Sequence, residues 1–214
     1  MTLNKTSSLF AVVALCLSMG SAVAQAVPST STTLTADERE SALKLFQTTH
    51  DNFVKSIAGL SEKQWKFKPA PDRWSVSEVA EHITVSESTI MGMIQHMLMQ
   101  SPAAPEKKEQ VKGKDQLILE KVPDRSRKAQ APEMLRPTGR WATEAELEKA
   151  FEDARKANMD YIRTTNDDLR DHFFDHPAFG TLDGYQWLLL IGTHSARHTK
   201  QIEEVKADPN FPKD

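Results

Sequence analysis

The sequence predicts an all-α fold, and specifically a four-helix bundle. Four segments repeat apolar residues with helical periodicity, and each follows a capping-box pattern, in which Ser, Thr or Asp stands three residues before Glu or Gln. Glycine is scarce, at 8 of 214 residues, and neither a strand pattern nor an internal repeat is visible. One such cap is common by chance, whereas four caps, each ahead of an amphipathic segment, consistently indicate helices.

The first two helices are expected at residues 35–58 and 75–100. The first begins at Thr35, with Glu38 completing the capping box, and the second begins at Ser75 with Glu78. The inward stripe of the first helix is Ala42, Phe46, Phe53 and Ile57. The inward stripe of the second is Val76, Val79, Ile83, Ile90, Ile94 and Met97. Residues 61–74 between them hold two prolines and two tryptophans, and should form one short turn and an irregular loop.

The last two helices are expected at residues 143–165 and 183–206. Thr143 with Glu146 and Asp183 with Gln186 form their capping boxes. The third stripe is Leu147, Phe151, Ala154, Tyr161 and Ile162, and the fourth is Trp187, Leu190, Ile191, Ile202 and Val205. Residues 101–142 carry five of the eleven prolines, and a connection of this length predicts a crossover along the bundle. Residues 166–182 are expected to be a loop.

The first 24 residues have the anatomy of a secretory signal peptide. Lys5 precedes an apolar run at residues 9–20, and Ala22 and Ala24 are the small residues of a cleavage site before Gln25. An uncleaved membrane anchor is the alternative, but the run is short for a membrane span. We therefore expect cleavage near Ala24, a periplasmic or secreted protein, and loss of Cys16, the only cysteine. Residues 25–34 are a polar leader that is expected to be disordered.

Composition and charge restrict the partners. The formal net charge is −3, which gives no overall field for nucleic acid. Residues 101–142 carry a local excess of ten basic over six acidic residues, but the two signs are interspersed, which argues against an electrostatic binding arm. We expect a small-molecule substrate, no nucleic-acid partner and no membrane association after cleavage. A homodimer is left open.

Two histidines mark the last helix as more than a core element. His194 and His198 are four residues apart, which places them about 40° apart around the axis and about 6 Å apart along it. They share the face of Trp187, Leu190 and Ile191, so both rings should point inward. Burying two imidazoles without partners is costly, and a divalent metal would remove that cost. From these two residues alone, metal ligation and ordinary core packing are about equally favoured.

A third ligand makes the metal hypothesis stronger. His82 lies beside the apolar stripe of the helix at 75–100, on a seam of polar residues. Gln201, three residues after His198, is a candidate for orienting an imidazole, and Glu78 is a weaker candidate near His82 because it already serves the capping box.

The remaining candidates have ordinary explanations. His50 is a weak fourth candidate, His96 is expected at the solvated rim, and His172 and His176 are expected in a solvated loop. Arg155 could meet an anionic substrate, but it is more typical of an arginine whose head reaches the surface.

Three stretches together resemble the DinB-like (DinB/YfiT-like) superfamily of four-helix-bundle metalloenzymes. They are AGLSEKQWKFKPAPDRWSVSEVAEHI at 58–83, APEMLRPTGRW at 131–141 and HPAFGTLDGYQWLLLIGTHSARHTKQI at 176–202. The resemblance covers essentially all of residues 35–212, so residues 35–214 are expected to be one DinB-like domain. It implies an up-down-down-up bundle in which His82, His194 and His198 bind a divalent transition metal, which could be Zn, Ni, Fe or Mn.

The resemblance leaves two classes of function. Characterised relatives include transferases and isomerases that use low-molecular-weight thiols, but an export signal argues against that chemistry because the exported compartment is oxidising. One class is a metal-dependent hydrolase or transferase of a small molecule, whose catalytic residues are unknown. The other is a non-catalytic metal- or ligand-binding bundle of the cell envelope. Three histidines without a fourth protein ligand favour the enzyme, because structural zinc sites are closed by four protein ligands.

Overall fold

The computed structural model describes residues 1–2 and 33–213. The predicted signal peptide, apart from its first two residues, and residues 25–32 of the predicted leader lie outside the described residues. The leader was expected to extend through Leu34, but the Leu34 side chain is buried against the core, so the ordered chain begins slightly earlier than predicted. Among the described residues, no helix has the length and apolar character needed to cross a bilayer.

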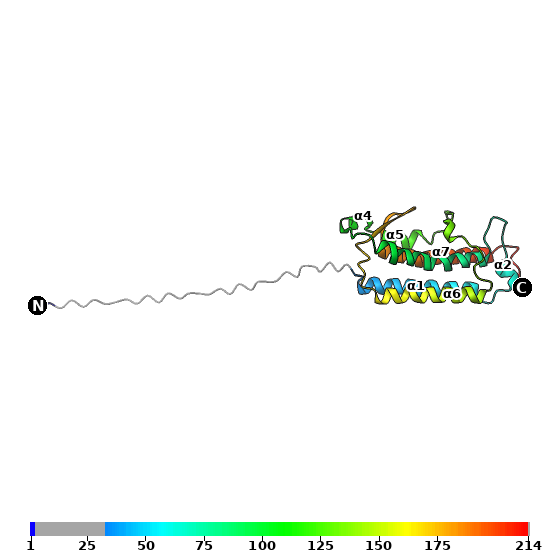
Figure 1. Ribbon diagram of the computed structural model, residues 1–214, viewed down its shortest axis with the longest axis horizontal. Coiled ribbons are helices and arrows are strands. Elements are labelled where there is room, and N and C mark those ends of the chain that lie inside the picture. Colours follow the sequence, from blue (N-terminus) through cyan, green and yellow to red (C-terminus); the bar gives the residue numbers. More distant parts are fainter. Residues whose placement is uncertain (3–32, 214) are drawn as a thin grey trace. The chain divides into compact units, whose positions relative to one another are not determined.

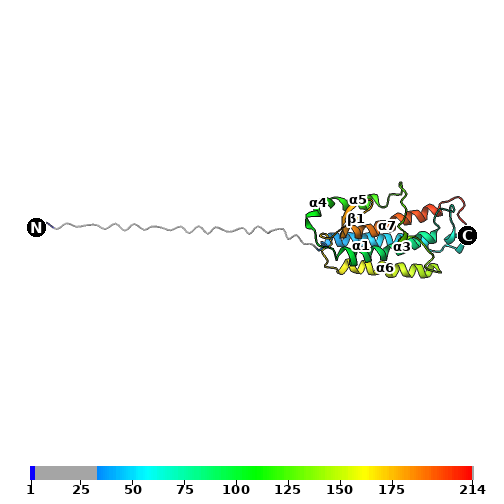
Figure 2. The same ribbon diagram turned by 45° about the horizontal axis from the view of Figure 1, so that its top comes forward.

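Four long helices form the bundle, as the sequence predicts (Figures 1 and 2). They are α1 (Ala36–Ile57), α3 (Val76–Met93), α6 (Glu144–Thr164) and α7 (Gly184–Lys206). Each begins with a complete capping box in which the cap side chain accepts a backbone N–H and the Glu or Gln accepts the cap N–H in return. The helix starts were therefore encoded locally, within four residues each.

Hydrogen bonds between the helices define an up-down-down-up topology. The Tyr185 hydroxyl donates to the Glu38 carbonyl at one end of the bundle, and Lys206 donates to the Ser56 carbonyl at the other, so α7 runs parallel to α1. Arg39 near the start of α1 donates to the carbonyl of Thr165, just past the end of α6, so α6 is antiparallel to α1. Figure 1 shows α1 and α6 side by side. The predicted fold class is confirmed.

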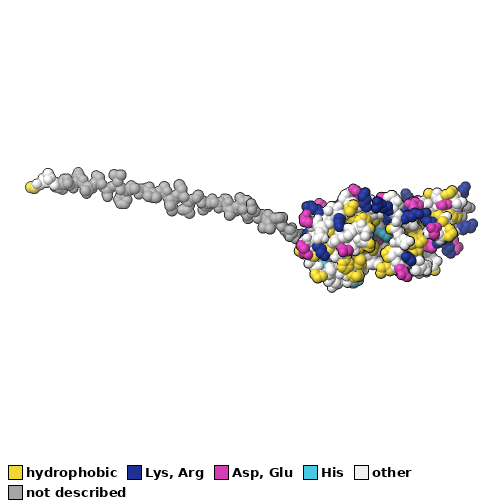
Figure 3. Space-filling view, turned by 90° about the horizontal axis from the view of Figure 1, so that it is seen from above, with side chains coloured by type: hydrophobic (Ala, Val, Ile, Leu, Met, Phe, Trp, Pro, Cys, Tyr) yellow, Lys and Arg dark blue, Asp and Glu magenta, His cyan; other side chains and the backbone are white. Residues whose placement is uncertain are grey.

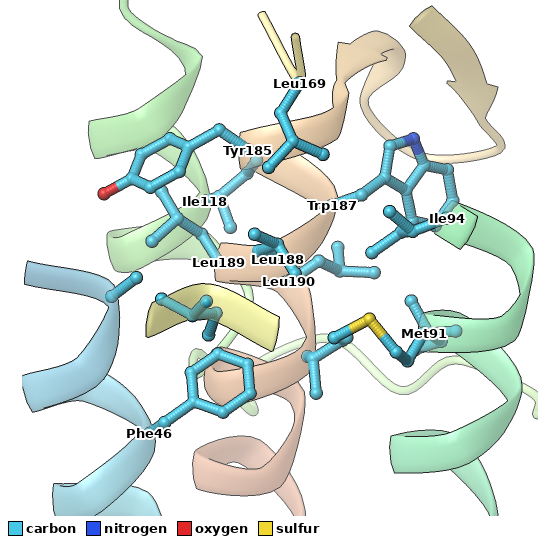
Figure 4. Close-up of a cluster of buried hydrophobic side chains, with 14 of the residues drawn as sticks. Phe46, Met91, Ile94, Ile118, Leu169, Tyr185, Trp187, Leu188, Leu189 and Leu190 are labelled. Atoms are coloured by element: carbon cyan, nitrogen blue, oxygen red, sulfur yellow. The ribbon is translucent and has the colours of Figure 1, made fainter. Parts of the chain in front are cut away.

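The bundle interior contains two hydrophobic clusters. The first includes Phe46, Ile94 and Leu188 and lies at the end where α7 begins (Figure 4). The second includes Phe53, Ile83 and Phe151, at the end where α7 finishes. Polar side chains of α3, α6 and α7 are buried as well, and these form the sites described below.

The helix predicted at 75–100 changes its winding near its end. After Met93 it continues as one π-helical turn, η1 (Ile94–Leu98). Met97 was expected to point inward but is 56% exposed, whereas Leu98 is fully buried. A π turn holds more residues than an α turn, so each residue rotates less around the axis and the inward position moves one residue along the chain.

The connections contain short helices. Residues 61–74 include α2 (Glu62–Lys66), which agrees with the expected short turn. The predicted crossover contains two short helices, α4 (Lys108–Val111) and α5 (Lys114–Lys121), and two 3₁₀ turns, η2 (Pro105–Lys107) and η3 (Glu133–Leu135). Helix α5 packs along α7, so the crossover covers that helix on its outer side (Figure 1).

The expectation of no strands was wrong for residues 166–182. Strands β1 (Phe173–His176) and β2 (Gly180–Asp183) form an antiparallel hairpin in which Phe174 pairs with Leu182 and His176 with Gly180. Gly180 adopts a φ of +64°, which an L side chain rarely adopts and which closes the tight turn. Four-residue strands are too short to show the alternation that identifies a strand in a sequence.

Candidate metal centre

Helices α3 and α7 bring the three predicted histidines together. The Nε2 atom of His82 lies 3.2 Å from Nε2 of His194 and 3.2 Å from Nε2 of His198. One ring nitrogen from each of the three lies within 4.8 Å of the other two. The helices run antiparallel here, and His82 in the first half of α3 meets His194 in the middle of α7 and His198 one turn later. Figure 3 shows a histidine side chain in a hollow of the surface, with Lys and Arg side chains nearby.

Hydrogen bonds fix which ring nitrogens carry protons. Nδ1 of His82 lies 2.7 Å from the carbonyl oxygen of Leu135. A carbonyl only accepts, so Nδ1 must donate, and the lone pair of the neutral ring is then on Nε2. Nδ1 of His198 lies 2.9 Å from Oε1 of Gln201, so the lone pair of His198 also lies on Nε2. The nitrogens that face one another at the site are therefore free to bind a cation.

The donor set fits a divalent transition metal. Metal–imidazole bonds of about 2.0–2.1 Å in tetrahedral geometry place neighbouring nitrogens about 3.3 Å apart, close to the observed 3.2 Å. Lone pairs at that separation repel each other unless a proton or cation lies between them. Imidazole is a good ligand for Zn, Ni and Fe, so three histidines do not select among these ions, whereas Mn prefers oxygen ligands and fits the site less well.

Desolvation keeps the three imidazoles neutral, although only His82 is fully buried and His194 and His198 are half-buried. Desolvation lowers the pKa of His82 below its usual value. Desolvation, together with the nearby charges of His82, Arg197 and His176, lowers the pKa of His194 to about 3. The pKa of His198 is lowered well below its usual value by desolvation and by the neighbouring histidines. Neutral imidazole is the form that binds a metal, so the site is ready for an ion at neutral pH without releasing protons.

Acid should destabilise the metal-free protein. In the unfolded chain each histidine takes up a proton near pH 6.5, whereas folded His194 remains neutral down to about pH 3. Between these values the unfolded chain binds more protons, so the free energy of unfolding falls as the pH falls, by about 1.4 kcal/mol per pH unit for each such histidine. Urea unfolding of the chelator-treated protein between pH 7 and pH 4.5 measures this slope. A His194→Ala variant should show a shallower slope, and equal slopes would contradict the assignment.

The crossover is held against the site from two sides. Glu81, beside His82 in the chain, is buried and accepts hydrogen bonds from the backbone N–H groups of Thr138 and Gly139, at 2.7 and 2.8 Å. Gly139 has a φ of +78°, the left-handed conformation that turns these N–H groups toward one carboxylate. On the other side, Arg197 of α7 donates to the carbonyls of Val122, Asp124 and Arg127. The predicted crossover therefore forms part of the wall around the histidines.

The two predicted supporting residues differ in position. Gln201 lies where it orients His198. Glu78 is not brought to the histidines: its carboxylate accepts the Ser75 N–H of the capping box and pairs with Lys68 at 2.9 Å.

Two other candidate histidines, His50 and His96, lie outside the cluster. His50 is engaged by Asp51 and Glu152, each at 2.8 Å, and so does not join the cluster. His96 is exposed, as expected.

Two histidines of the last connection were placed wrongly by the sequence. His172 is buried and lies 3.0 Å from a carboxylate oxygen of Asp168. His176 is half-buried at the tip of the hairpin, where its ring lies 5.3 Å from that of Trp187. Its Nδ1 accepts the Ala178 N–H, so the neutral ring carries its proton on Nε2. The hairpin, absent from the prediction, is what brings His176 beside Trp187 of α7.

Sequence reasoning missed a buried ion pair in the same bundle. Arg155 was expected to reach the surface, but it and Glu87 are each 1% exposed. Two guanidinium nitrogens of Arg155 bind the two carboxylate oxygens of Glu87, at 2.5 and 3.1 Å. Ser195, next to His194, donates to the same carboxylate at 2.7 Å. The available signal was position, since Glu87 lies between Ile83 and Ile90 on the inward stripe.

Comparisons with known proteins agree with this fold. Residues 45–202 match the family described as the DinB superfamily. A relative from Bacillus subtilis (strain 168), "Uncharacterized protein YuaE", is 26% identical over 150 residues, which are 70% of this chain and 88% of the relative. The solved structure of YfiT from Bacillus subtilis is described as "a probable metal-dependent hydrolase with an unusual four-helix bundle topology". It aligns with a TM-score of 0.51 at 12% identity, over 84% of this chain and 91% of YfiT, a similarity of fold.

Proposed function

This chain belongs to the DinB superfamily, and from that membership we propose that it is a metal-dependent hydrolase of small molecules whose divalent ion is bound by His82, His194 and His198. One observation carries the proposal: three neutral imidazoles present Nε2 atoms to one point, two of them fixed in that tautomer by hydrogen bonds. The description of YfiT, which shares the fold, supports the choice of a hydrolase.

The number of ligands favours catalysis over a structural role. Among the described residues, the group able to hold an ion consists of three histidines, whereas structural zinc sites have four protein ligands. A divalent ion held by three ligands supplies Lewis-acid polarisation and lowers the pKa of water. The protein positions and desolvates the site: the Trp74 ring lies 5.0 Å from that of His82 and excludes water on that side.

His176 is a candidate substrate-binding residue. It comes from the hairpin, and its ring lies 5.3 Å from that of Trp187, which is seven residues before His194 on α7. Burial lowers the pKa of His176, so the ring is neutral at pH 7 and offers an Nε2–H donor. We propose that this donor binds an oxygen of the substrate.

We also propose that the chain is exported, on the strength of the apolar run at residues 9–20 and the small residues Ala22 and Ala24. The protein then acts in the periplasm or outside the cell, and its mature form begins at Gln25.

The test uses the full chain expressed with its own N-terminus. Protein recovered from the periplasm should have the mass of a chain starting at Gln25 and contain about one equivalent of divalent metal by elemental analysis. It should hydrolyse members of a panel of carboxylic esters, amides and phosphoesters, and activity should disappear with a chelator and return with added Zn²⁺, Ni²⁺, Fe²⁺ or Mn²⁺.

Each part of the proposal can fail separately. A metal-loaded protein that hydrolyses no member of the panel would favour the non-catalytic metal- or ligand-binding bundle. A protein that binds no metal would refute the site. Full-length protein retained in the cytoplasm would refute export.

A further inference from the structure

An arginine of the crossover contacts the residue that orients His198. A guanidinium N–H of Arg125 donates to Oε1 of Gln201, with a distance of 3.1 Å. The rest of the guanidinium is held by Glu204, whose two carboxylate oxygens lie 2.6 and 2.8 Å from other Arg125 nitrogens. The Arg125 side chain is only 16% exposed. A chain of hydrogen bonds therefore runs from Glu204 through Arg125 and Gln201 to His198.

The order of donors along this chain determines the tautomer of His198. Arginine has donors and no acceptor, so the Gln201 atom that faces Arg125 must be the amide oxygen. The same oxygen lies 2.9 Å from Nδ1 of His198. Nδ1 must therefore carry the proton, and Nε2 must present its lone pair to the metal-binding point.

Gln201 could not impose this tautomer by itself. A glutamine amide can rotate by half a turn and present its NH₂ group instead of its oxygen. If the NH₂ group faced His198, Nδ1 would accept its hydrogen bond and the ring proton would be on Nε2. The Nε2 atom could then not bind the ion. His82 is different because its partner is the Leu135 carbonyl, a backbone group that can only accept. The Gln201 amide can either donate or accept, so a third group must fix its orientation. The Leu135 carbonyl can only accept and needs no such group.

We propose that Arg125 is a positioning residue of the metal centre: by holding Gln201 with its oxygen toward His198, it keeps Nε2 of His198 free for the ion and so sets the metal affinity. The inference rests on the proposed function for the identity of the metal site. The effect of Arg125 on the tautomer of His198, however, does not require a bound metal. Glu204 contributes by holding Arg125, and the crossover thereby controls two of the three ligands.

The test compares two variants of the full chain. Arg125→Met removes the donors while keeping an apolar stem, and we expect the Zn²⁺ affinity, measured by competition with a chromophoric chelator, to fall about 10–100-fold. In the metal-free protein, imidazole ¹⁵N NMR should show Nδ1–H for His198 in the wild type and a mixture or Nε2–H in the variant. Combining Arg125→Met with Gln201→Glu should restore both the Zn²⁺ affinity and the Nδ1–H tautomer of His198, because a carboxylate can only accept a hydrogen bond.

The experiment also needs a matched control variant and a check that every variant is folded. Arg127→Met alters an exposed arginine two residues away and should leave both measurements unchanged. Circular dichroism should give the same helical signal for every variant. The inference is overturned if Arg125→Met keeps the wild-type Zn²⁺ affinity and the Nδ1–H tautomer. It is also overturned if the double variant Arg125→Met with Gln201→Glu does not restore them. If the wild type binds no Zn²⁺, the proposed function fails, and the tautomer measurement still decides the role of Arg125.

Discussion

Replacing Arg155 with methionine should lower the free energy of unfolding by about 3–5 kcal/mol, because it leaves the buried Glu87 carboxylate without its cation. Methionine fills much of the same volume, so the loss comes mainly from the unpaired charge rather than from a cavity. Arg155 also donates to the Phe46 carbonyl and to Thr49, so the change frees acceptors on α1 as well. Urea denaturation monitored by circular dichroism measures the effect.

The adjacent lysine provides a matched control. Lys156 pairs with Asp160 at 2.6 Å, but the two side chains are 77% and 47% exposed. Lys156→Met should therefore change stability by no more than about 0.5 kcal/mol. Removing both buried charges, as Arg155→Met with Glu87→Gln, should recover part of the loss. An Arg155→Met protein as stable as the Lys156→Met protein would show that the buried pair contributes nothing net.

Replacing His82 with alanine should weaken metal binding by two to three orders of magnitude. Four-ligand zinc sites bind with about 10–16 kcal/mol, so one ligand supplies about 2.5–4 kcal/mol. His82 lies 3.2 Å from each of the other two ligand atoms and is the only one of the three on α3, so its loss leaves two ligands on one helix. Competition titration with Zn²⁺ on chelator-treated protein measures the change.

The control for His82 is a histidine of the same chain segment that lies outside the site. His96, in the π-helical turn that follows α3, is exposed, so His96→Ala should bind metal as the wild type does. Both variants should retain the helical circular dichroism signal, since His82→Ala removes no capping or core apolar residue. Unchanged affinity in His82→Ala would show that the histidine cluster is a packing feature.

Much of the fold could be predicted because its signals are short in sequence. A capping box spans four residues, and an amphipathic stripe repeats within one helix, so the start of α7 at Asp183 and its inward face could be assigned without knowing its neighbours. The spacing of His194 and His198 alone placed both rings on one side of α7, but the structure leaves them half-buried at the site and buries Ser195 and Thr199 instead. The third ligand, His82, was a candidate from its place on a polar seam beside the apolar stripe, and the family resemblance then assigned it to the metal site.

By itself, then, the sequence determined the four helices, their starts and the shared face of His194 and His198, because each depends on residues within one or two helical turns. Only the tertiary structure decided that Glu87 meets Arg155 and that Arg125 meets Gln201, because these contacts join residues 68 and 76 positions apart. Such pairs depend on how the helices and the crossover pack, which the periodicity of a single helix does not encode. For the same reason His176 changed from an expected solvated loop residue to a half-buried neighbour of Trp187.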